Sequence, residues 1–270
     1  MLKFNIITIF PQIFDSYFSE SIIRRAKEGA FVDIAVHNLR DFTHDVHKTV
    51  DDTPYGGGAG MVMKVEPIYR AVGSIISNFP VSTQADPSRL VETTTCRSEA
   101  DASSSRGGQF PPPAGGSNEF SNSNSKISKP ENTRIILFSA KGKRYTQRDA
   151  VRLSKYENII MICGRYEGVD ERVAQNLVDE EISIGDFVLT GGEIPAMVLV
   201  DSLTRLVPGV LGNEKSIEIE SHSEEGYLEY PQYTKPDSFK DWPVPEVLLS
   251  GNHEKIAQWR EAQSKRNKQI

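Results

Sequence analysis

Residues 184–197 read IGDFVLTGGEIPAM, an apolar and β-branched run that stops at a glycine pair and continues as a helix-like apolar segment. Because glycine has no Cβ, a glycine pair between two buried elements lets the backbone approach another group closely. A second break of this kind lies upstream, at residues 159–168, which read IIMICGRYEG. Two glycine-bearing loops, each at the end of an apolar run, predict the walls of one small-molecule site.

The segments around these loops alternate between strand-like apolar runs and helix-like amphipathic stretches. This rhythm continues to about residue 212 and predicts an α/β domain with a mostly parallel sheet. Strands are expected at residues 4–10, 31–36, 134–138 and 159–163. Helices are expected at residues 11–27, 67–77, 149–153 and 171–177.

Two further stretches divide the chain. Residues of about 80–132 are dense in Ser, Pro, Gly, Asn and Thr and contain no Trp, Tyr or Met, so they predict a disordered insertion without a catalytic role. Residues 213–226 are polar and predict a linker. The expected organisation is therefore a domain over 1–212 that carries the insertion, the linker, and a small helical domain over 227–270. The last helix is expected from Asn252 to the end.

Composition narrows the function classes. The chain has 270 residues, two cysteines and a formal net charge of −6. Cys96 and Cys163 form no disulfide framework, so a reducing, cytoplasmic compartment is expected. No apolar run approaches the length of a membrane span, and no membrane partner is expected. The negative charge argues against nonspecific coating of nucleic acid, but it leaves an RNA substrate open because local patches decide such binding.

Other polar motifs leave alternatives open. Residues 164–168, GRYEG, are neither a Walker loop nor a dinucleotide fingerprint, and a tight strand-to-helix turn is the structural alternative. His44 and His47 lack partners at metal-ligand spacing, so no metal site is predicted and a polar substrate loop is favoured. Arg205 follows a helical segment rich in Leu and Val and is either a surface arginine or a functional one. Glu218 and Glu220 are either candidates for a general base or merely solvated residues of an acidic linker.

These segments closely resemble the bacterial TrmD-type tRNA (guanine-N1)-methyltransferases of the SPOUT superfamily, over nearly the whole chain except about 80–132. The resemblance rests on RDFTHD at 40–45, TVDD at 49–52, PYGGG at 54–58, CGRYEG at 163–168, the run at 184–197, PGVLG at 208–212 and LSGNH at 249–253. It implies a SPOUT-type parallel sheet with a deep trefoil knot, a small α-helical C-terminal domain that binds tRNA, and a homodimer with its active sites at the subunit interface.

The resemblance also implies the reaction. S-adenosyl-L-methionine would donate a methyl group to N1 of the guanosine at tRNA position 37, just 3′ of the anticodon, with a preceding guanosine required. Guanine N1 carries a proton at neutral pH, so the transfer needs a base, and a cation can stabilise the charge that develops on O6. By resemblance the base is Glu220, with Glu218 as the alternative, and the catalytic arginine is Arg205.

Binding roles follow from the same resemblance. The residues expected at the methyl donor are Phe138, Ser139, Ala140, Gly164, Glu167, Ile184, Gly185, Phe187, Leu189, Gly191, Gly192 and Pro195. The residues expected at the tRNA substrate are His47, Asp51, Tyr55, Arg165 and Ser221. Members of the family depend on Mg²⁺, although the sequence shows no dedicated protein site for the ion.

The chain departs from the family in several places. Ala140 stands where the family usually has proline, and His222 stands where it usually has phenylalanine, with one extra residue before Gly226. The insertion is foreign to the family, and the helical C-terminal domain is shortened beyond Trp259 and Arg260. Two alternatives therefore remain, a SPOUT methyltransferase with changed RNA specificity and an RNA-binding protein that has lost catalysis.

Overall fold

The structure is a computed structural model that describes residues 1–79, 127–212, 220–224 and 226–266. Its centre is a five-stranded sheet in the order β2-β1-β6-β5-β7, with every neighbouring pair parallel. The strands are β1 Leu2–Thr8, β2 Val32–Asn38, β5 Thr133–Arg144, β6 Asn158–Ile162 and β7 Glu180–Ser183. The predicted α/β class with a parallel sheet is confirmed.

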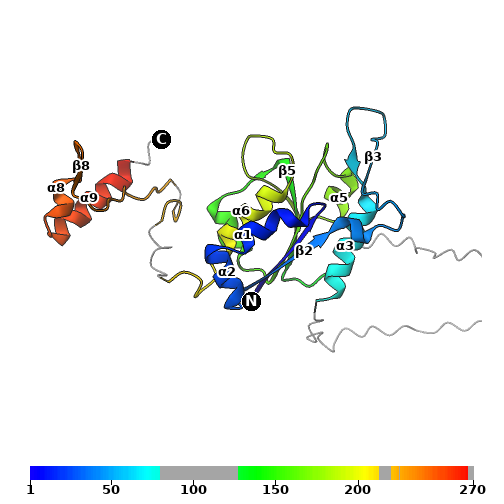
Figure 1. The fold of residues 1–270 in the computed structure, drawn as a ribbon, viewed down its shortest axis with the longest axis horizontal. Helices are drawn as coiled ribbons and strands as arrows, with labels where there is room; N and C mark the ends of the chain where they lie inside the picture. The colour runs from blue at the N-terminus through cyan, green and yellow to red at the C-terminus, as the bar shows by residue number, and fades with distance from the viewer. Residues whose placement is uncertain (80–126, 213–219, 225, 267–270) are drawn as a thin grey trace, which may run out of the picture.

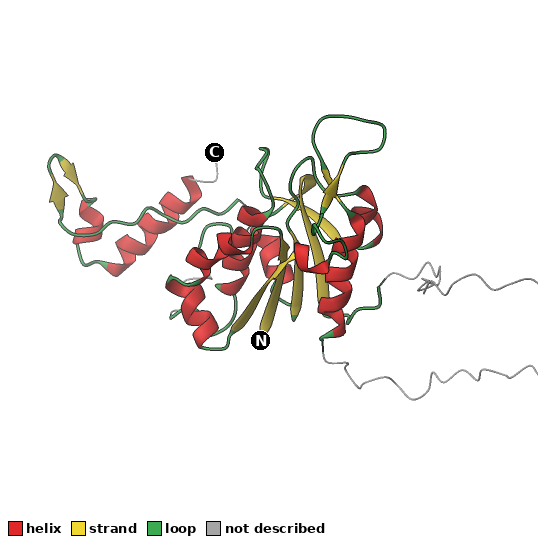
Figure 2. Ribbon diagram, turned by 45° about the vertical axis from the view of Figure 1, so that its right-hand side comes forward, coloured by secondary structure: helices red, strands yellow, loops and turns green. Residues whose placement is uncertain are grey.

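Helices cover both faces of this sheet (Figures 1 and 2). One apolar core packs under α2 Ser21–Glu28, α4 Gln147–Leu153 and α6 Glu193–Thr204, and the other under α3 Val65–Ser77 and α5 Glu171–Asn176. Every residue of β6 is buried, with Ile159 and Met161 in the first core and Ile160 and Ile162 in the second. A parallel strand that is covered on both faces needs such a continuous apolar run, which is the reason that β6 is recognisable from sequence.

The predicted single helix over residues 11–27 is wrong. The chain there forms a 3-10 turn at Pro11–Phe14, the short helix α1 at Asp15–Phe18, and α2 from Ser21. Ser21 has a φ of 51°, a left-handed conformation that redirects the chain between the two helices. The break lets Phe14, Phe18 and Ile23 all reach the first core.

The apolar run before the glycine pair is also not the buried element that its composition suggests. Strand β7 ends at Ser183, and residues 184–190 form a loop. Phe187 is 54% exposed and Val188 is 86% exposed. Burial in the core of this chain therefore does not explain why residues 184–190 are apolar.

Strand β5 leaves the ladder in its second half. Phe138 and Lys143 both lie opposite Ile182 of β7, so residues 139–142 are out of register with that strand. A Cβ on Gly142 would lie 2.7 Å from the backbone carbon of Glu181, which shows how closely the two segments pass. Side chains larger than glycine do not fit at this crossing.

Residues 80–126 lie outside the described residues, and so does most of the predicted insertion. Its predicted end at residue 132 is too late, because residues 127–132 belong to the folded domain. Ile127 packs against the second core, Lys129 pairs with Asp179, and the Asn132 carbonyl accepts hydrogen bonds from the backbone of Glu157 and Asn158. These contacts anchor the start of β5.

Short elements complete the described chain. A two-stranded hairpin, β3 Asp51–Asp52 with β4 Val62–Met63, follows a 3-10 turn at Leu39–Phe42. After residue 226 come the hairpin β8 Ser238–Phe239 with β9 Trp242–Pro243, then α8 Glu246–Leu249 and α9 His253–Arg266. Neither hairpin is predicted from sequence. Within the described ranges, no helix combines the length and apolar character that a membrane crossing requires.

Candidate active site

A cavity of about 450 Å³ lies at the ends of β6 and β7, beside the irregular segment of β5. Its walls are residues 137–141 of β5, the end of β7, the loops that follow β6 and β7, and the first turns of α5 and α6. Loops at the carboxyl ends of parallel strands are the usual place for ligands in open α/β sheets, because adjacent strands deliver their loops to one edge. The two glycine-bearing loops therefore form two walls of one cavity, as their sequences predict.

The structure brings almost all of the expected donor residues together. The cavity is lined by Phe138, Ser139, Ala140, Gly164, Glu167, Ile184, Phe187, Leu189, Gly191, Gly192 and Pro195. Gly185 is not on the wall; its carbonyl accepts a hydrogen bond of 2.9 Å from the Ser183 hydroxyl. Arg165, which was expected at the tRNA, lines this cavity as well.

The glycine pair approaches the protein's own chain. The Gly192 amide donates to the Gly164 carbonyl at 3.0 Å, and a Cβ on Gly192 would lie 2.7 Å from the Cα of Cys163. A Cβ on Gly191 would overlap the side chain of Arg165. The close approach that the pair predicts is therefore to the other glycine loop, and it brings both loops to the edge of the cavity.

Arg165 bridges the two loops. Its Nη2 atom lies 2.9 Å from Oε2 of Glu193, and its Nη1 atom donates to the Thr190 carbonyl at 3.2 Å. Its guanidinium lies over the Phe10 ring, 4.8 Å from the ring centre. Burial raises the pKa of the neighbouring Cys163 thiol well above its usual value, with the Glu193 carboxylate adding to the effect, so this cysteine is a neutral packing residue.

The cavity wall also carries charged side chains that were not among the residues expected at the methyl donor. Lys141 and Glu171 form an ion pair of 2.7 Å, and the hydrogen bond to Glu171 raises the pKa of Lys141. Glu181 lines the cavity with a buried carboxylate oxygen, Oε2, that has no hydrogen-bond partner. An unsatisfied buried acceptor is costly, and a ligand with an N–H or O–H group would satisfy it.

Arg205 and Glu220 form the second part of the candidate site. The guanidinium donates two hydrogen bonds to the carboxylate, of 2.6 and 2.5 Å, and both side chains are about one quarter exposed. The hydrogen bonds with Glu220 raise the pKa of Arg205 above its usual value, so the arginine stays charged. This paired geometry joins the end of α6 to the linker.

The pair lies away from the cavity of its own chain. Neither Arg205 nor Glu220 lines the cavity, whereas Pro195 in the first turn of the same helix does. Ten helical positions separate Pro195 from Arg205, which is roughly 15 Å along the helix axis at 1.5 Å per residue. One chain therefore does not place its expected base beside its own donor cavity.

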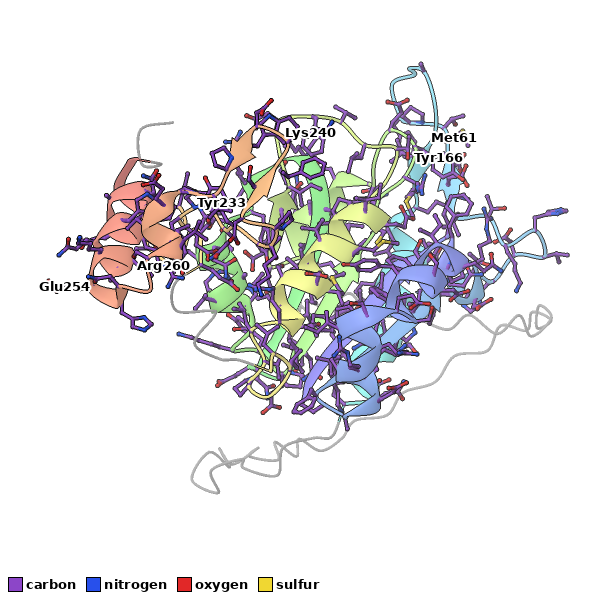
Figure 3. All side chains as sticks on the ribbon, turned by 60° about the vertical axis from the view of Figure 1, so that its left-hand side comes forward. Met61, Tyr166, Tyr233, Lys240, Glu254 and Arg260 are labelled. Atoms are coloured by element: carbon purple, nitrogen blue, oxygen red, sulfur yellow. The ribbon has the colours of Figure 1, made fainter. Side chains whose placement is uncertain are left out.

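The other expected substrate residues are placed as follows. Asp51 lies in β3 and Tyr55 is fully exposed in the glycine-rich loop that follows, while His47 lies in an exposed turn. The hairpin that carries this loop contacts the cavity through backbone hydrogen bonds, including one of 3.1 Å from the Glu167 amide to the Met61 carbonyl. Figure 3 shows Met61 beside Tyr166 at this contact.

The linker residues complete the expected set. Ser221 follows Glu220, and its hydroxyl accepts a hydrogen bond of 2.9 Å from the Glu229 amide. Glu218 lies outside the described residues. In the part of the chain that the structure describes, no group of three or more His, Cys, Asp or Glu side chains is placed to hold a metal ion.

Sequence reasoning missed Glu181 and Glu193. Glu193 stands in the quoted run, directly after the glycine that caps α6, and an acidic residue in a first helical turn is a recognisable local signal. The burial of Glu193 against Thr8 cannot be recognised from sequence, because the two residues are far apart in the chain. Glu181 carries no local signal, since its open acceptor depends on how β5 and β7 pass each other.

Comparisons with known proteins identify the family to which the chain is similar. A family model described as tRNA (Guanine-1)-methyltransferase TrmD matches residues 2–95 and 117–270. The unmatched residues, 96–116, fall inside the predicted insertion. The chain is 46% identical to a protein of Dictyoglomus turgidum over 96% of this chain and 84% of the relative. It is 43% identical to a protein of Dehalococcoides mccartyi, over 98% of this chain and 86% of the relative. It is 42% identical to a protein of Clostridioides difficile, over 97% of this chain and 92% of the relative. Each relative is named tRNA (guanine-N(1)-)-methyltransferase.

Proposed function

We propose that this chain, which belongs to the TrmD family and is a tRNA (guanine-N1)-methyltransferase, uses S-adenosylmethionine to methylate the guanosine at position 37, just 3′ of the anticodon. We further propose that a guanosine must precede the target. The observation that carries the proposal is the cavity at the ends of β6 and β7 and beside residues 137–141 of β5, where eleven of the twelve expected donor residues meet.

The cavity suits the proposed donor. S-adenosylmethionine has a flat adenine, two ribose hydroxyls, and positive charge at its sulfonium and amino groups. Phe187 and Leu189 offer apolar contact surface, and Glu167 and Glu181 supply carboxylates that complement positive charge. The unpartnered Oε2 of Glu181 needs a hydrogen-bond donor, which the ribose hydroxyls or an amino group provide. When bound, the donor supplies an electrophilic methyl group.

The chain's own residues then handle the proton and the charge. Guanine presents N1–H and O6 side by side on one edge. Glu220 and Arg205 already lie side by side as an acceptor and a donor, so the same pair matches that edge. Glu220 accepts the proton from N1, and Arg205 donates to O6, where negative charge develops as N1 attacks.

We propose that the complete site needs two copies of the chain. The separation of roughly 15 Å between the cavity and Arg205 along α6 supports this arrangement. An exposed apolar surface extends along α6 and the adjoining N-terminal turns, where Tyr17 donates to Asp201. Its exposed members are Phe10, Ile13, Tyr17, Ile194 and Val198. A patch of this kind on a folded domain is characteristic of an interface, and a second copy would bring its Glu220 to the cavity.

We also infer a deep trefoil knot in the chain path. Ile182 lies opposite both Phe138 and Lys143, so the chain passes β7 on both sides of the irregular segment 139–142. The close approaches at Gly142 and Gly192 support such threading, because both require bare backbone where segments cross.

The part that follows the linker is proposed to be a separate tRNA-binding domain, with the linker at residues 213–226. It holds a groove of about 410 Å³ lined by aromatic and cationic side chains, including Tyr233, Trp259 and Arg260. Figure 3 labels Tyr233 and Arg260. Arg260 lies over the ring of Tyr230 at 4.8 Å. Aromatic faces with neighbouring cations suit unpaired bases and phosphates of RNA.

The experiment that tests the function is methyl transfer from labelled S-adenosylmethionine to two tRNA transcripts. They differ in having guanosine or adenosine before the target guanosine. We expect transfer to the first alone, with the product identified as N1-methylguanosine at position 37 by nuclease digestion and mass spectrometry. Transfer to both, or to another position, would support changed RNA specificity instead. Donor binding without transfer would support an RNA-binding protein that has lost catalysis.

A further inference from the structure

We propose that Glu193 is a positioning residue of the donor cavity. It accepts a hydrogen bond from Thr8, pairs with Arg165, and so holds the two glycine loops at the spacing that donor binding requires. The inference rests on the proposed function and adds to it two residues, Thr8 and Glu193, to which neither the family resemblance nor the cavity wall assigns a role.

Glu193 is buried although it carries a charge. Its side chain is 2% exposed at the first position of α6. Oε1 accepts a hydrogen bond of 2.7 Å from the hydroxyl of Thr8, which ends β1 in the middle of the sheet. Oε2 lies 2.9 Å from Arg165 Nη2 without hydrogen-bond geometry. The amide groups at the start of α6 add a favourable electrostatic contribution.

Arg165 transmits this anchoring to the cavity. It belongs to the loop after β6, and it reaches across to the loop after β7 by donating to the Thr190 carbonyl at 3.2 Å. The backbones of Arg165 and Gly191 also pair directly as an isolated antiparallel bridge. Both loops line the cavity, so the position of the Arg165 side chain sets their separation there.

The ion pair lies directly over the glycine pair. A Cβ on Gly191 would come within 2.6 Å of Glu193 Oε2 as well as overlapping Arg165. Elsewhere the loop after β7 is held by an exposed ion pair between Asp186 and Arg144, and its apolar side chains project outward, with Val188 86% exposed and Phe187 54% exposed. Glu193 therefore connects a loop that projects into solvent to a buried residue of the central sheet.

The arrangement is expensive if its only role is stability. Burying a carboxylate and a guanidinium costs desolvation energy that their attraction often does not recover, and apolar side chains of similar size can stabilise a protein better. Buried charged pairs that hold ligand-contacting loops in place act on binding instead. Glu193 contacts Thr8 in the sheet and Arg165 on the cavity wall, so its interactions connect the sheet to the cavity.

The test compares Glu193→Gln with Glu180→Gln. Glu180 is a matched control because its carboxylate is also largely buried and pairs with two arginines, Arg134 and Arg152, without lining the cavity. S-adenosylhomocysteine binding is measured by titration calorimetry and methyl transfer at saturating donor. For Glu193→Gln we expect the Kd to rise roughly tenfold, a size typical of residues that orient ligand-contacting groups, with kcat within about threefold. Glu180→Gln should leave the Kd unchanged.

Two further variants guard against a folding defect. Thr8→Val removes the hydroxyl that donates to Glu193, and it should raise the Kd in the same direction; Thr8→Ser keeps the hydroxyl and should restore it. An unchanged Kd in Glu193→Gln, or an equal rise in Glu180→Gln, would overturn the inference.

Amide hydrogen exchange over residues 184–192 separates this inference from the proposed function, because it needs no ligand. We expect faster exchange there in Glu193→Gln than in the parent protein, with Glu180→Gln unchanged in this loop. Equal exchange in the two variants would contradict the proposal that Glu193 holds this loop in place. A parent protein that does not bind S-adenosylhomocysteine would contradict the donor assignment, whatever the exchange shows.

Discussion

Glu220 and Arg205 neutralise each other in the free protein, and this has a consequence for catalysis. The Glu220 carboxylate accepts two hydrogen bonds from the Arg205 guanidinium, so an acceptor and a donor lie side by side. Guanine can take the place of each partner, since it offers N1–H to Glu220 and O6 to Arg205. In the proposed reaction, the ion pair would keep Glu220 and Arg205 side by side until a guanine edge enters between them.

Replacing Glu220 by glutamine tests this assignment. Glutamine retains an acceptor for Arg205 but takes up no proton at neutral pH, so methyl transfer should fall by about 10²- to 10⁴-fold. S-adenosylhomocysteine affinity should not change, because the proposed role of Glu220 is to contact the guanine and not the methyl donor. Glu224→Gln, an exposed change in the same linker, is the control and should retain full activity. Equal turnover in both variants would shift the role to another carboxylate, of which Glu218 is the sequence alternative.

Two kinds of contact join the helices, strands and loops of this fold: close backbone approaches at glycines, and ion pairs. Gly192 passes the end of β6 with no room for a side chain, whereas a Cβ added to Gly73 in α3 would enter open space. Beside β7, Glu180 pairs with Arg134 from β5 and Arg152 from α4. The close approach of Gly192 to β6 shapes the cavity. The ion pairs of Glu180 hold the edge strand β7 against its neighbours.

Gly192→Ala and Gly73→Ala form a matched pair at this scale. The new methyl group of Gly192→Ala would meet the Cys163 backbone at 2.7 Å, so we expect a loss of about 1–3 kcal/mol in unfolding free energy and weaker donor binding. Gly73→Ala should be stabilising by about 0.5–1 kcal/mol because alanine favours the helix. Urea unfolding measures both. Stability unchanged by Gly192→Ala would mean that the crossing is looser than the geometry indicates.

The Glu180 contacts predict an acid sensitivity. Burial on its own would raise the pKa of Glu180, but hydrogen bonds from Arg152 and Arg134 lower it below its usual value. The unfolded chain then binds a proton at a higher pH than the folded one, near its ordinary pKa of about 4.3. Stability from this group is present above that pH and is lost as the pH falls through the lower folded value.

Urea unfolding of the parent protein and Glu180→Gln between pH 7 and pH 3 measures this contribution. We expect the variant to be less stable at pH 7 by about 1–3 kcal/mol and to lose less on acidification. Parallel curves for the two proteins across the whole range would show that Glu180 does not cause the pH dependence.

For the whole molecule, the exposed apolar surface around α6 and the distance to Glu220 point to the same requirement. In the proposed dimer, a second subunit would supply the base to the donor cavity of the first while covering the apolar surface. Val198→Asp on α6 should therefore give monomers and abolish methyl transfer, because it places a charge in the proposed interface. Val151→Asp, at a similarly exposed position on α4, is the control and should remain dimeric in analytical ultracentrifugation.

Subunit mixing tests the composite site directly. Glu220→Gln and a cavity variant such as Gly192→Ala should each be nearly inactive alone. When co-refolded, heterodimers contain one site with a normal base and a normal cavity, so activity should return to about a quarter of the parent level at random pairing. No recovery would indicate that each chain uses its own Glu220.

The sequence by itself determined the α/β class, the order of most elements and the two glycine loops of the cavity, whereas the other expected donor residues were named through the family resemblance. These features depend on local patterns: apolar runs that form buried parallel strands, and glycine loops that follow them to one edge of the sheet. The break at Ser21, the partnership of Thr8 with Glu193, the open acceptor of Glu181 and the Arg205–Glu220 pair were decided only by the tertiary structure. Each of these depends on which distant segments pack together, as Thr8 and Glu193 do across 185 positions, and local propensity carries no information about such distances.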